Sequence, residues 1–393
     1  MNRLNLMANS PDVLEVRLRH RMSSEFRPSS ELKKQELNTR ELSSQFSLEA
    51  DFSVPAGITI LFGPSGAGKS TLLDCIAGVR RPEAGRIVAG GQRWFDSDAG
   101  IDVPLRKRRV GYVMQGLSLF PHLSVQENVE YGLYRLPSRE RAMRAAAMLE
   151  TFKIGHLRQE PATCISGGER QRVALARVLV TEPAAVLLDE PLTALDAATR
   201  SRLIADLRAW NSLNPVPILC VTHNREEVFA LGERLVAIDG GRLLAVGTPQ
   251  ELLQAPRHEL LAQLAGFENI FDVTVTACDG NSGTMTCQLH PEGASLEVPL
   301  GSESPGDHVR IGIRAGDILL ANQRPEGLSA RNILAGRILR LEHRDRTVVA
   351  EVNCGATFQV HLTPGSQHSL RLGPSSEVWL IIKTYSCHLL RSS

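Results

Sequence analysis

Residues 63–71 read Gly-Pro-Ser-Gly-Ala-Gly-Lys-Ser-Thr and match the pattern G-x-x-x-x-G-K-[ST]. An apolar run at 58–62 precedes the glycines, and a helix-compatible segment at 71–77 follows them. Glycines let the backbone turn its N–H groups toward a phosphate, and a helix start adds partial positive charge. In this setting Lys69 can bridge β- and γ-phosphates, and the Ser70 hydroxyl can bind Mg²⁺. The stretch therefore predicts a nucleotide phosphate site at a strand-to-helix turn.

Short apolar runs and helical stretches alternate after this turn. The runs lie at 186–188, 218–221 and 235–238, with helix-forming stretches between them. Such alternation is typical of an α/β domain with a largely parallel sheet. Between about 116 and 180 the strand signals disappear, and Ser124-Val-Gln-Glu127 has capping-box spacing. We therefore expect an α/β domain with an inserted helical subdomain at about 116–180.

Two further segments suit phosphate chemistry. Residues 185–190, Ala-Val-Leu-Leu-Asp-Glu, form an apolar run that ends in two carboxylates. Asp189 would hold Mg²⁺ through water, and Glu190 would take a proton from an attacking water. Residues 165–171, Ile-Ser-Gly-Gly-Glu-Arg-Gln, open a helix whose start is a second anion-binding end. Alone, the first segment is equally consistent with an ordinary strand end, and beside the phosphate loop we favour its functional interpretation. Alone, the second segment is more consistent with an ordinary helix cap, and the resemblance described below reverses this preference.

The last third of the chain has a different pattern of helix and strand signals. From about residue 266 the helix signals fade, and alternating runs such as 271–278, 309–313 and 378–382 are separated by turn residues. This pattern is typical of a small all-β barrel. We therefore expect a tail at 1–13, the α/β domain at 14–265 with an insertion at about 23–42, and a β-barrel domain at 266–393.

Composition excludes several classes of protein. The 393 residues carry 44 Lys plus Arg and 43 Asp plus Glu, and the net charge of +1 argues against a general polyanion binder. The seven cysteines have no C-x-x-C spacing, so we expect neither a metal cage nor a disulfide framework. We find no apolar run of about 18 residues and no signal-peptide centre, so we expect a chain that does not itself span a membrane. The basic run at 106–109 is interpreted as a solvated loop rather than a nucleic-acid site.

The motifs and their order resemble those of the ATP-binding subunits of ABC transporters. Besides the phosphate loop, Gln115 lies in Tyr-Val-Met-Gln-Gly, and His223 lies in Val-Thr-His-Asn-Arg-Glu-Glu-Val. The signature at 165–171 begins with Ile where the family usually has Leu. The likeness covers most of residues 52–250. It implies an ABC-type P-loop NTPase that uses ATP and Mg²⁺, in which two copies pair so that each ATP lies between one P-loop and the other copy's signature.

The resemblance also implies roles for single residues. Glu190 would be the catalytic base, His223 would hold the γ-phosphate, and Gln115 would sense Mg²⁺ and the attacking water while facing a membrane partner. Mg²⁺ would be held by Ser70, Gln115 and Asp189. The nucleotide and the dimer contact would involve Gly63, Pro64, Ser65, Gly66, Ala67, Gly68, Lys69, Ser70, Thr71, Ser166, Gly167, Gly168 and Asp196. Phe46 and Phe52 are candidates for an aromatic that stacks on adenine, and neither is chosen.

The β-rich C-terminal region reduces the number of substrate classes to be expected. Residues 327–336, Gly-Leu-Ser-Ala-Arg-Asn-Ile-Leu-Ala-Gly, resemble the opening of the Mop-like (TOBE, OB-like) domain of molybdate importer ATPases, which implies a Mop-like part at about 327–391. A tetrahedral dianion such as molybdate needs fixed donors. The candidate donors are Ser329, Arg331, Asn332 and Lys383. Because Tyr385 departs from the family pattern of Lys, a small residue and then Ser or Thr, a purely structural barrel is an equal alternative.

The resemblance therefore implies the ATPase of a molybdate (or tungstate) importer, peripheral at the cytoplasmic face of the inner membrane. Its partners would be permease subunits, an external molybdate-binding protein and a second copy of itself, and no nucleic acid. Alternatives are the ATPase of an importer for sulfate, ferric iron or a polyamine, a soluble ABC ATPase without a transport role, and an oxyanion-storage module. The single P-loop and the absence of sustained heptads argue against the second, and the intact Lys69 and Glu190 argue against the third.

Overall fold

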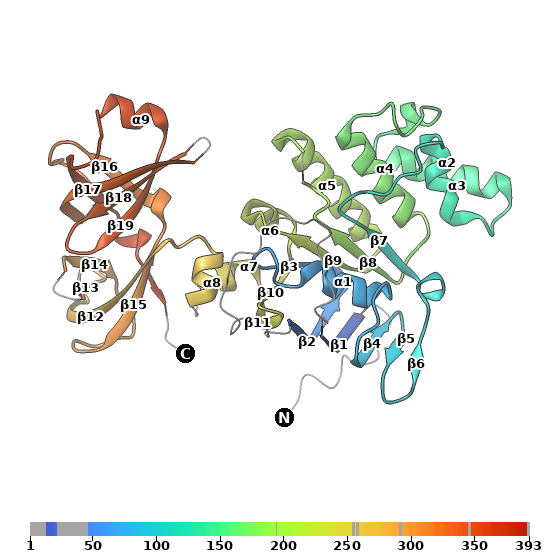
Figure 1. The fold of residues 1–393 in the computed structure, drawn as a ribbon, viewed down its shortest axis with the longest axis horizontal. Coiled ribbons are helices and arrows are strands. Elements are labelled where there is room, and N and C mark those ends of the chain that lie inside the picture. The colour runs from blue at the N-terminus through green and yellow to red at the C-terminus, as the bar shows by residue number, and fades with distance from the viewer. Residues whose placement is uncertain are drawn as a thin grey trace, which may run out of the picture. The chain divides into compact units, whose positions relative to one another are not determined.

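The computed structural model describes residues 13–21, 46–193, 195–253, 256, 259–290, 293–344 and 347–390. The chain forms two compact units, Met1–Pro249 and Gln250–Ser393. Each unit has its own core and is described by itself below (Figure 1).

A mixed sheet is the centre of the first unit, with the strand order β6-β5-β4-β1-β2-β11-β10-β3-β9-β8-β7. The strands β10, β3, β9, β8 and β7 pair in parallel, which confirms the predicted α/β domain. Every residue of β8 and β9 is buried, as expected where helices cover both faces, whereas β2 alternates between exposed and buried residues. The strands are β1 (Val13–Arg21), β2 (Ser47–Pro55), β3 (Gly57–Phe62), β4 (Ala84–Ala89), β5 (Gln92–Asp96), β6 (Ile101–Asp102), β7 (Val110–Val113), β8 (Ala185–Asp189), β9 (Pro217–Thr222), β10 (Arg234–Asp239) and β11 (Arg242–Gly247).

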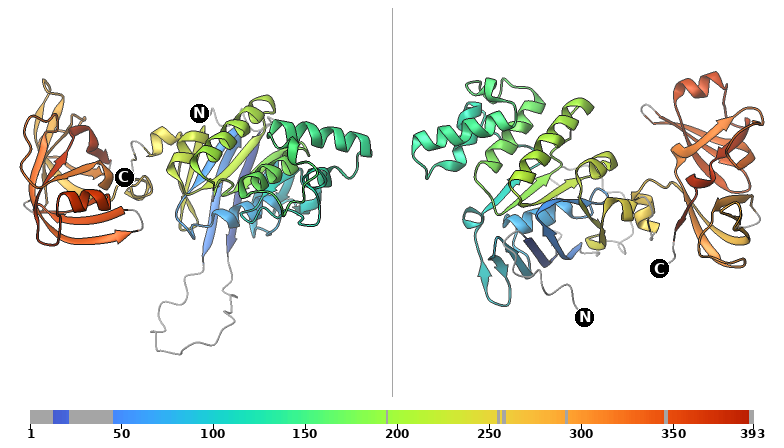
Figure 2. Two further views of the ribbon diagram at one scale, coloured as in Figure 1. Left: turned by 90° about the horizontal axis from the view of Figure 1, so that it is seen from above. Right: turned by 180° about the vertical axis from the view of Figure 1, so that it is seen from behind.

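The predicted helical subdomain is confirmed between β7 and β8. Figures 1 and 2 show α2, α3 and α4 grouped at one side of the sheet. Helix α2 begins with the predicted capping box: Ser124 accepts the backbone N–H of Glu127, and the Glu127 carboxylate accepts the N–H of Ser124. The helices of this unit are α1 (Lys69–Ala77), α2 (Val125–Glu130), α3 (Ser138–Thr151), α4 (Gly167–Leu179), α5 (Ala197–Leu213) and α6 (Arg225–Leu231). Short 3-10 turns lie at Leu105–Lys107, Tyr131–Leu133 and Gly155–Leu157.

The basic run at 106–109 is not simply a solvated loop, and our interpretation of it was wrong for Arg108. Its side chain is only 1% exposed, and the guanidinium donates to the carbonyl oxygens of Ile76 at 2.6 Å and Val103 at 2.7 Å. It also contacts the Asp102 carboxylate at 3.3 Å. Because α1 leaves carbonyl groups unpaired at its C-terminal end, Arg108 satisfies acceptors that would otherwise be buried without a donor.

The second unit is all-β apart from short helices, as predicted. It contains two curled five-stranded antiparallel sheets, with the orders β14-β13-β12-β15-β21 and β16-β20-β17-β18-β19. The strands are β12 (Asn269–Asp279), β13 (Thr284–Leu289), β14 (Ser295–Pro299), β15 (His308–Ile313), β16 (Ile318–Ala321), β17 (Asn332–Arg344), β18 (Thr347–Asn353), β19 (Thr357–Leu362), β20 (Glu377–Ile382) and β21 (His388–Leu390). The helices are α7 (Pro249–Leu253), α8 (Glu259–Leu264) and α9 (Pro364–Ser369), with 3-10 turns at Ala315–Asp317 and Thr384–Ser386.

The strands of this unit form two repeats of one pattern, β12 to β16 and β17 to β21, which the sequence analysis missed. In each repeat a long strand pairs with a hairpin partner and with a later strand, and the last strand of each repeat joins the other sheet. Buried Asn269 begins β12, and its amide exchanges two hydrogen bonds with the backbone of Gln359 in β19. Buried Asn332 begins β17 and makes the same pair of bonds with Glu297 in β14. Each repeat is thus tied to the edge strand of the other.

Helix α7, and Phe267 in the segment after α8, contact Arg314 of the β unit. Arg314 donates to the carbonyl oxygen of Leu253 at 3.2 Å, and its guanidinium lies over the Phe267 ring at 4.4 Å. The two compact units therefore divide at Pro249, whereas the sequence analysis placed the end of the α/β domain at residue 265.

Candidate functional site

The site is assembled at the carboxyl edge of the parallel strands. The register pairs Phe62 of β3 with Thr222 of β9, and Asp189 of β8 with Val221 of β9. Residues that follow β3, β8 and β9 therefore emerge at one edge of the sheet. Motifs that lie far apart in sequence meet there because parallel strands end at the same side.

The phosphate loop has the backbone that its glycines predict. Gly66 and Gly68 have φ values of 81° and 97°, in the left-handed region that L side chains rarely adopt. A Cβ atom on Gly63 would lie 2.1 Å from the carbonyl oxygen of Ile238, so only glycine fits there. Gly68 is the N-cap of α1, and the helix starts directly at Lys69. The loop therefore presents a helix start, as phosphate binding requires.

Lys69 lies inside this loop. It is 8% exposed, and its ammonium donates to the carbonyl oxygens of Gly63 at 2.9 Å and Pro64 at 2.8 Å. Burial lowers the pKa of Lys69, while the carboxylates of Glu190 and Asp189 act in the opposite direction. The buried ammonium can bind a polyanion, and the neighbouring carboxylates offer oxygen ligands to Mg²⁺.

Ser70 and Asp189 form the expected metal-binding pair. Burial raises the pKa of Asp189, while its interaction with the Ser70 side chain acts in the opposite direction, so the two groups lie close together. Both groups offer oxygen, the ligand atom that Mg²⁺ prefers. The described residues contain no cluster of three or more His, Cys, Asp or Glu side chains that could hold a metal alone. The residues fit Mg²⁺ bound through a few protein oxygens and the phosphates, rather than in an all-protein cage.

The three predicted catalytic residues are in direct contact. Nδ1 of His223 lies 3.0 Å from Oε1 of Glu190, and Nε2 of Gln115 donates to Oε2 of Glu190 at 3.3 Å. Glu190 has a φ of 49°, an uncommon conformation for a residue other than glycine. Such strain persists only where the surroundings hold it, and it is concentrated at functional sites.

Two threonines that the sequence analysis missed support this cluster. Thr193 donates from its hydroxyl to the carbonyl oxygen of Glu190 at 2.7 Å. Thr222, directly before His223, donates to the buried carboxylate of Glu227 at 2.5 Å, and Arg200 lies 3.4 Å from that carboxylate. A signal was present, since Thr222 and Glu227 lie in the same motif as His223, but the spacing alone does not show the contact.

The signature segment caps α4 and faces outward. Ser166 is the N-cap, with a full capping box to Glu169, and the Ser166 hydrogen bonds lower the pKa of Glu169. Ser166 and Gly167 are exposed. Among the described residues, residues 166–168 form no hydrogen bond with residues 63–71. The signature does not complete the phosphate site of its own chain through those bonds.

Asp196 also serves as a helix cap. Its carboxylate accepts the backbone N–H groups of Ala198 and Thr199, both at 3.0 Å, and these bonds lower the pKa of Asp196. The signature packs close by, because Gln171 on α4 donates to the carbonyl oxygen of Thr193 at 3.1 Å. The loop from Glu190 to α5 is thus in contact with the signature helix.

The two candidate adenine aromatics lie in different surroundings. Phe52 is 8% exposed and belongs to the core of the first unit. Phe46 is half-buried, and its ring packs against Gly68 of the phosphate loop and against Gly241. Only Phe46 is beside the nucleotide site. The inserted stretch at 23–42 lies outside the described residues.

Of the predicted oxyanion donors, Asn332 has a different role. Its amide is buried and bonded to the backbone of Glu297 as described above, so its side chain is not available to an anion, and we correct that prediction. Ser329, Arg331 and Lys383 are exposed. The pairing of Asn332 with Ile382 brings Arg331 and Lys383 to the same end of this strand pair.

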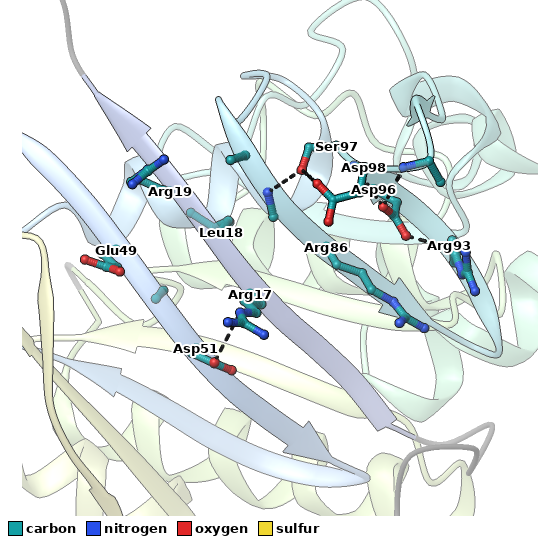
Figure 3. A pocket seen from close by; sticks show the side chains of 14 residues that line it. Arg17, Leu18, Arg19, Glu49, Asp51, Arg86, Arg93, Asp96, Ser97 and Asp98 are labelled. Carbon is teal, nitrogen blue, oxygen red and sulfur yellow. Dashed lines mark hydrogen bonds and ion pairs between the residues drawn. The ribbon is translucent and has the colours of Figure 1, made fainter.

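A separate hollow of about 820 Å³ lies on the outer face of the antiparallel strands of the first unit (Figure 3). Arg17 pairs with Asp51 at 3.5 Å, and Arg93 pairs with Asp96 at 3.5 Å. Four arginines and four carboxylates line this hollow, so its charges balance. It contains none of the predicted site residues.

Comparison with known proteins agrees with this geometry. Residues 49–193 match the ABC transporter family, and residues 328–389 match the TOBE domain. The molybdenum import ATP-binding protein ModC of Rhizobium etli is 38% identical over 341 residues, which cover 86% of this chain and 95% of that protein. ModC 1 of Azotobacter vinelandii is 36% identical, covering 86% and 94%, and ModC of Rhizobium meliloti is 35% identical, covering 89% and 98%. The solved structure of cbiO1 from Clostridium perfringens, part of the ABC transporter complex cbiONQ, has a TM-score of 0.50 and 25% identity, covering 65% of this chain and 95% of that chain.

Proposed function

The chain belongs to the family of molybdenum import ATP-binding proteins, and we propose that it hydrolyses ATP to energise molybdate uptake through an ABC importer. The observation that carries this proposal is the contact of Glu190 with both His223 and Gln115 at the edge where the phosphate loop emerges. A base, a phosphate-binding histidine and a water-orienting amide are the groups that phosphoryl transfer to water needs.

The geometry supports a defined set of roles. Backbone N–H groups of the loop and the Lys69 ammonium bind the β- and γ-phosphates, and Ser70 and Asp189 would hold Mg²⁺. When bound, Mg²⁺ neutralises charge on the phosphate oxygens. Gln115 orients the attacking water, and Glu190 accepts its proton as the water oxygen bonds to the γ-phosphorus and the bond to the β–γ bridging oxygen breaks. His223, held beside Glu190, donates to the γ-phosphate.

A second copy of the chain would complete the site. Ser166 and Gly167 are exposed at the N-terminal end of α4, where partial positive charge favours an anion. We expect this end to contact the γ-phosphate on the other copy's loop, with the Asp196 region at the contact. Head-to-tail pairing of two identical chains gives two equivalent sites.

The helical subdomain offers the surface for a permease. A hollow of about 490 Å³ is lined by Glu127, Glu130, Tyr131, Tyr134 and Arg141. The side chains of Tyr131 and Tyr134 are well exposed. The Tyr131 ring packs against the Phe120 ring, with 4.3 Å between the two ring centroids. Exposed aromatics beside carboxylates suit a protein contact. No described helix is long and apolar enough to cross a bilayer, and we expect the chain to be held at the membrane by permease subunits that receive molybdate from an external binding protein.

Replacing Glu190 tests the proposal. We expect Glu190→Gln to bind ATP normally and to hydrolyse it about 10²–10⁴-fold more slowly, because the amide cannot accept the proton of the attacking water. Phosphate release is measured with the permease complex, and uptake of labelled molybdate is measured in cells that produce only the variant. Glu226→Gln, which changes an exposed carboxylate on α6, is the matched control and should behave like the parent.

Two results would contradict the proposal. Parent-like hydrolysis by Glu190→Gln would remove Glu190 from its role. Loss of sulfate uptake with molybdate uptake unchanged would assign the chain to another importer.

A further inference from the structure

The turn that follows Gln115 is held in an unusual backbone conformation. Leu117 and Ser118 have φ values of 56° and 48°, and neither is glycine. Two consecutive L residues in the left-handed region are disfavoured unless neighbouring groups fix them. The turn also has internal bonds, from the N–H of Leu117 to the Met114 carbonyl oxygen at 2.9 Å and from Ser118 to Gly116 at 2.6 Å.

Arg177 holds this turn from outside. Its guanidinium donates to the carbonyl oxygen of Ser118 at 2.7 Å and to that of Leu117 at 2.9 Å. Its centre also lies 5.4 Å from the ring of Phe120. A planar guanidinium can serve both carbonyl groups at once, which a lysine ammonium does with less fixed geometry.

The burial and the partners of Arg177 show that its main contacts are with this turn. The side chain is partly buried, and burial lowers the pKa of Arg177. Among the described residues, no carboxylate forms an ion pair with it, so the carbonyl groups and the aromatic ring are its partners. The guanidinium therefore stabilises the turn through hydrogen bonds to its carbonyl groups, rather than through a surface ion pair.

Arg177 connects two parts of the proposed ATP site. It lies on α4, the helix that begins at Gly167 after the N-cap Ser166. Its guanidinium donates a hydrogen bond to Leu117 in the turn that carries Gln115. Gln115 in turn reaches the Glu190 carboxylate at 3.3 Å. We propose that Arg177 is a positioning residue that fixes the Gln115 turn to the signature helix, and so holds the Gln115 amide beside Glu190, where it can reach the reacting water and Mg²⁺. The inference rests on the proposed ATPase function.

The Mg²⁺ dependence of hydrolysis tests it, with the full chain in its permease complex. We expect Arg177→Leu to raise the half-activating Mg²⁺ concentration about fivefold, while the affinity for a fluorescent ATP analogue without Mg²⁺ stays within about twofold. Arg177→Lys should fall between this variant and the parent. Arg208→Leu, which removes an exposed arginine from α5, is the matched control and should leave the Mg²⁺ dependence unchanged.

A double variant separates positioning from a general structural role. If Arg177 acts through Gln115, then adding Arg177→Leu to Gln115→Ala should change the half-activating Mg²⁺ concentration no further. Additive effects, or an Arg177→Leu variant with parent-like Mg²⁺ dependence, would overturn the inference. Arg177→Lys provides the same readout if Arg177→Leu does not fold. Failure of the proposed function is distinguishable, because the parent complex would then hydrolyse no ATP.

Discussion

Glu190 is held by groups from several parts of the first unit. Gln115 follows β7, His223 follows β9, and Thr193 lies in the loop after β8, and all three contact Glu190. The backbone N–H of Glu190 also donates to the carbonyl oxygen of Val221 at 3.1 Å. A carboxylate fixed from several sides loses little orientation freedom when water attacks, which favours its role as a base.

His388 provides a residue-scale prediction about pH. Its ring packs edge-on against Phe267 at 5.0 Å, and burial, with Arg314 nearby, lowers the pKa of His388, although Asp317 acts in the opposite direction. The folded chain therefore binds this proton less readily than the unfolded chain. The stabilising contribution is present above the unfolded pKa of about 6.5 and is lost as the pH falls through the lowered value.

We expect His388→Gln to reduce this dependence. Thermal unfolding of the full chain, followed between about pH 7.5 and 5, should show a smaller decrease in melting temperature for the variant than for the parent. His122→Gln is the control. Equal slopes for His388→Gln and the parent would rule out the contribution of His388.

The motif residues could be predicted because their spacing is local. Lys69, Asp189 and Glu190 lie in motifs that begin or end with a short apolar run, so the sequence alone indicated that they belong to the turns and ends of strands. Arg108 and Arg177 could not be predicted, because their partners are backbone carbonyl groups of segments brought close only by folding. A carbonyl group has no sequence signature, and the same limit applied to the Asn332 amide.

At the scale of elements, alternating runs predicted only some of the strands of the β unit. The predicted run 271–278 lies in β12, and 378–382 lies in β20. The repeat was missed because its halves share few residues, among them Asn-Ile at the start of each long strand and a cation after the strand that pairs with it. What the halves share is strand pairing, which periodicity does not reveal.

The matched asparagines predict equal destabilisation of the two repeats. Asn269→Ala and Asn332→Ala each leave a partly buried backbone N–H and C=O without partners, so each should lower the free energy of unfolding by about 1–3 kcal/mol. Denaturant unfolding of the full chain measures this. Asn281→Ala, in an exposed turn, should stay within about 0.5 kcal/mol of the parent. If only one of the two buried positions were sensitive, the links would not be equivalent.

At the scale of the whole molecule, the chain joins an ATPase unit to a β unit that includes its own linker helices. The motifs and strand patterns predicted both units, and the sequence analysis placed the boundary near residue 265, where the helix signals fade. In the structure Arg314 of the β unit contacts Leu253 of α7 and Phe267, and the compact units divide at Pro249. The exposed signature residues are the basis of our proposal that a second copy of the chain completes the site.

The most direct test of this account is the mass of the full-length Glu190→Gln chain in sedimentation velocity, with and without ATP. The account predicts a doubling of mass with ATP. It also predicts that adding Ser166→Asp abolishes the doubling while ATP still binds, because Asp remains a good helix N-cap but places a negative charge against the other copy's γ-phosphate. Ser124→Asp, the same change at the capping box of α2, should dimerise like the parent. Undiminished dimerisation of the Ser166→Asp chain would contradict the account.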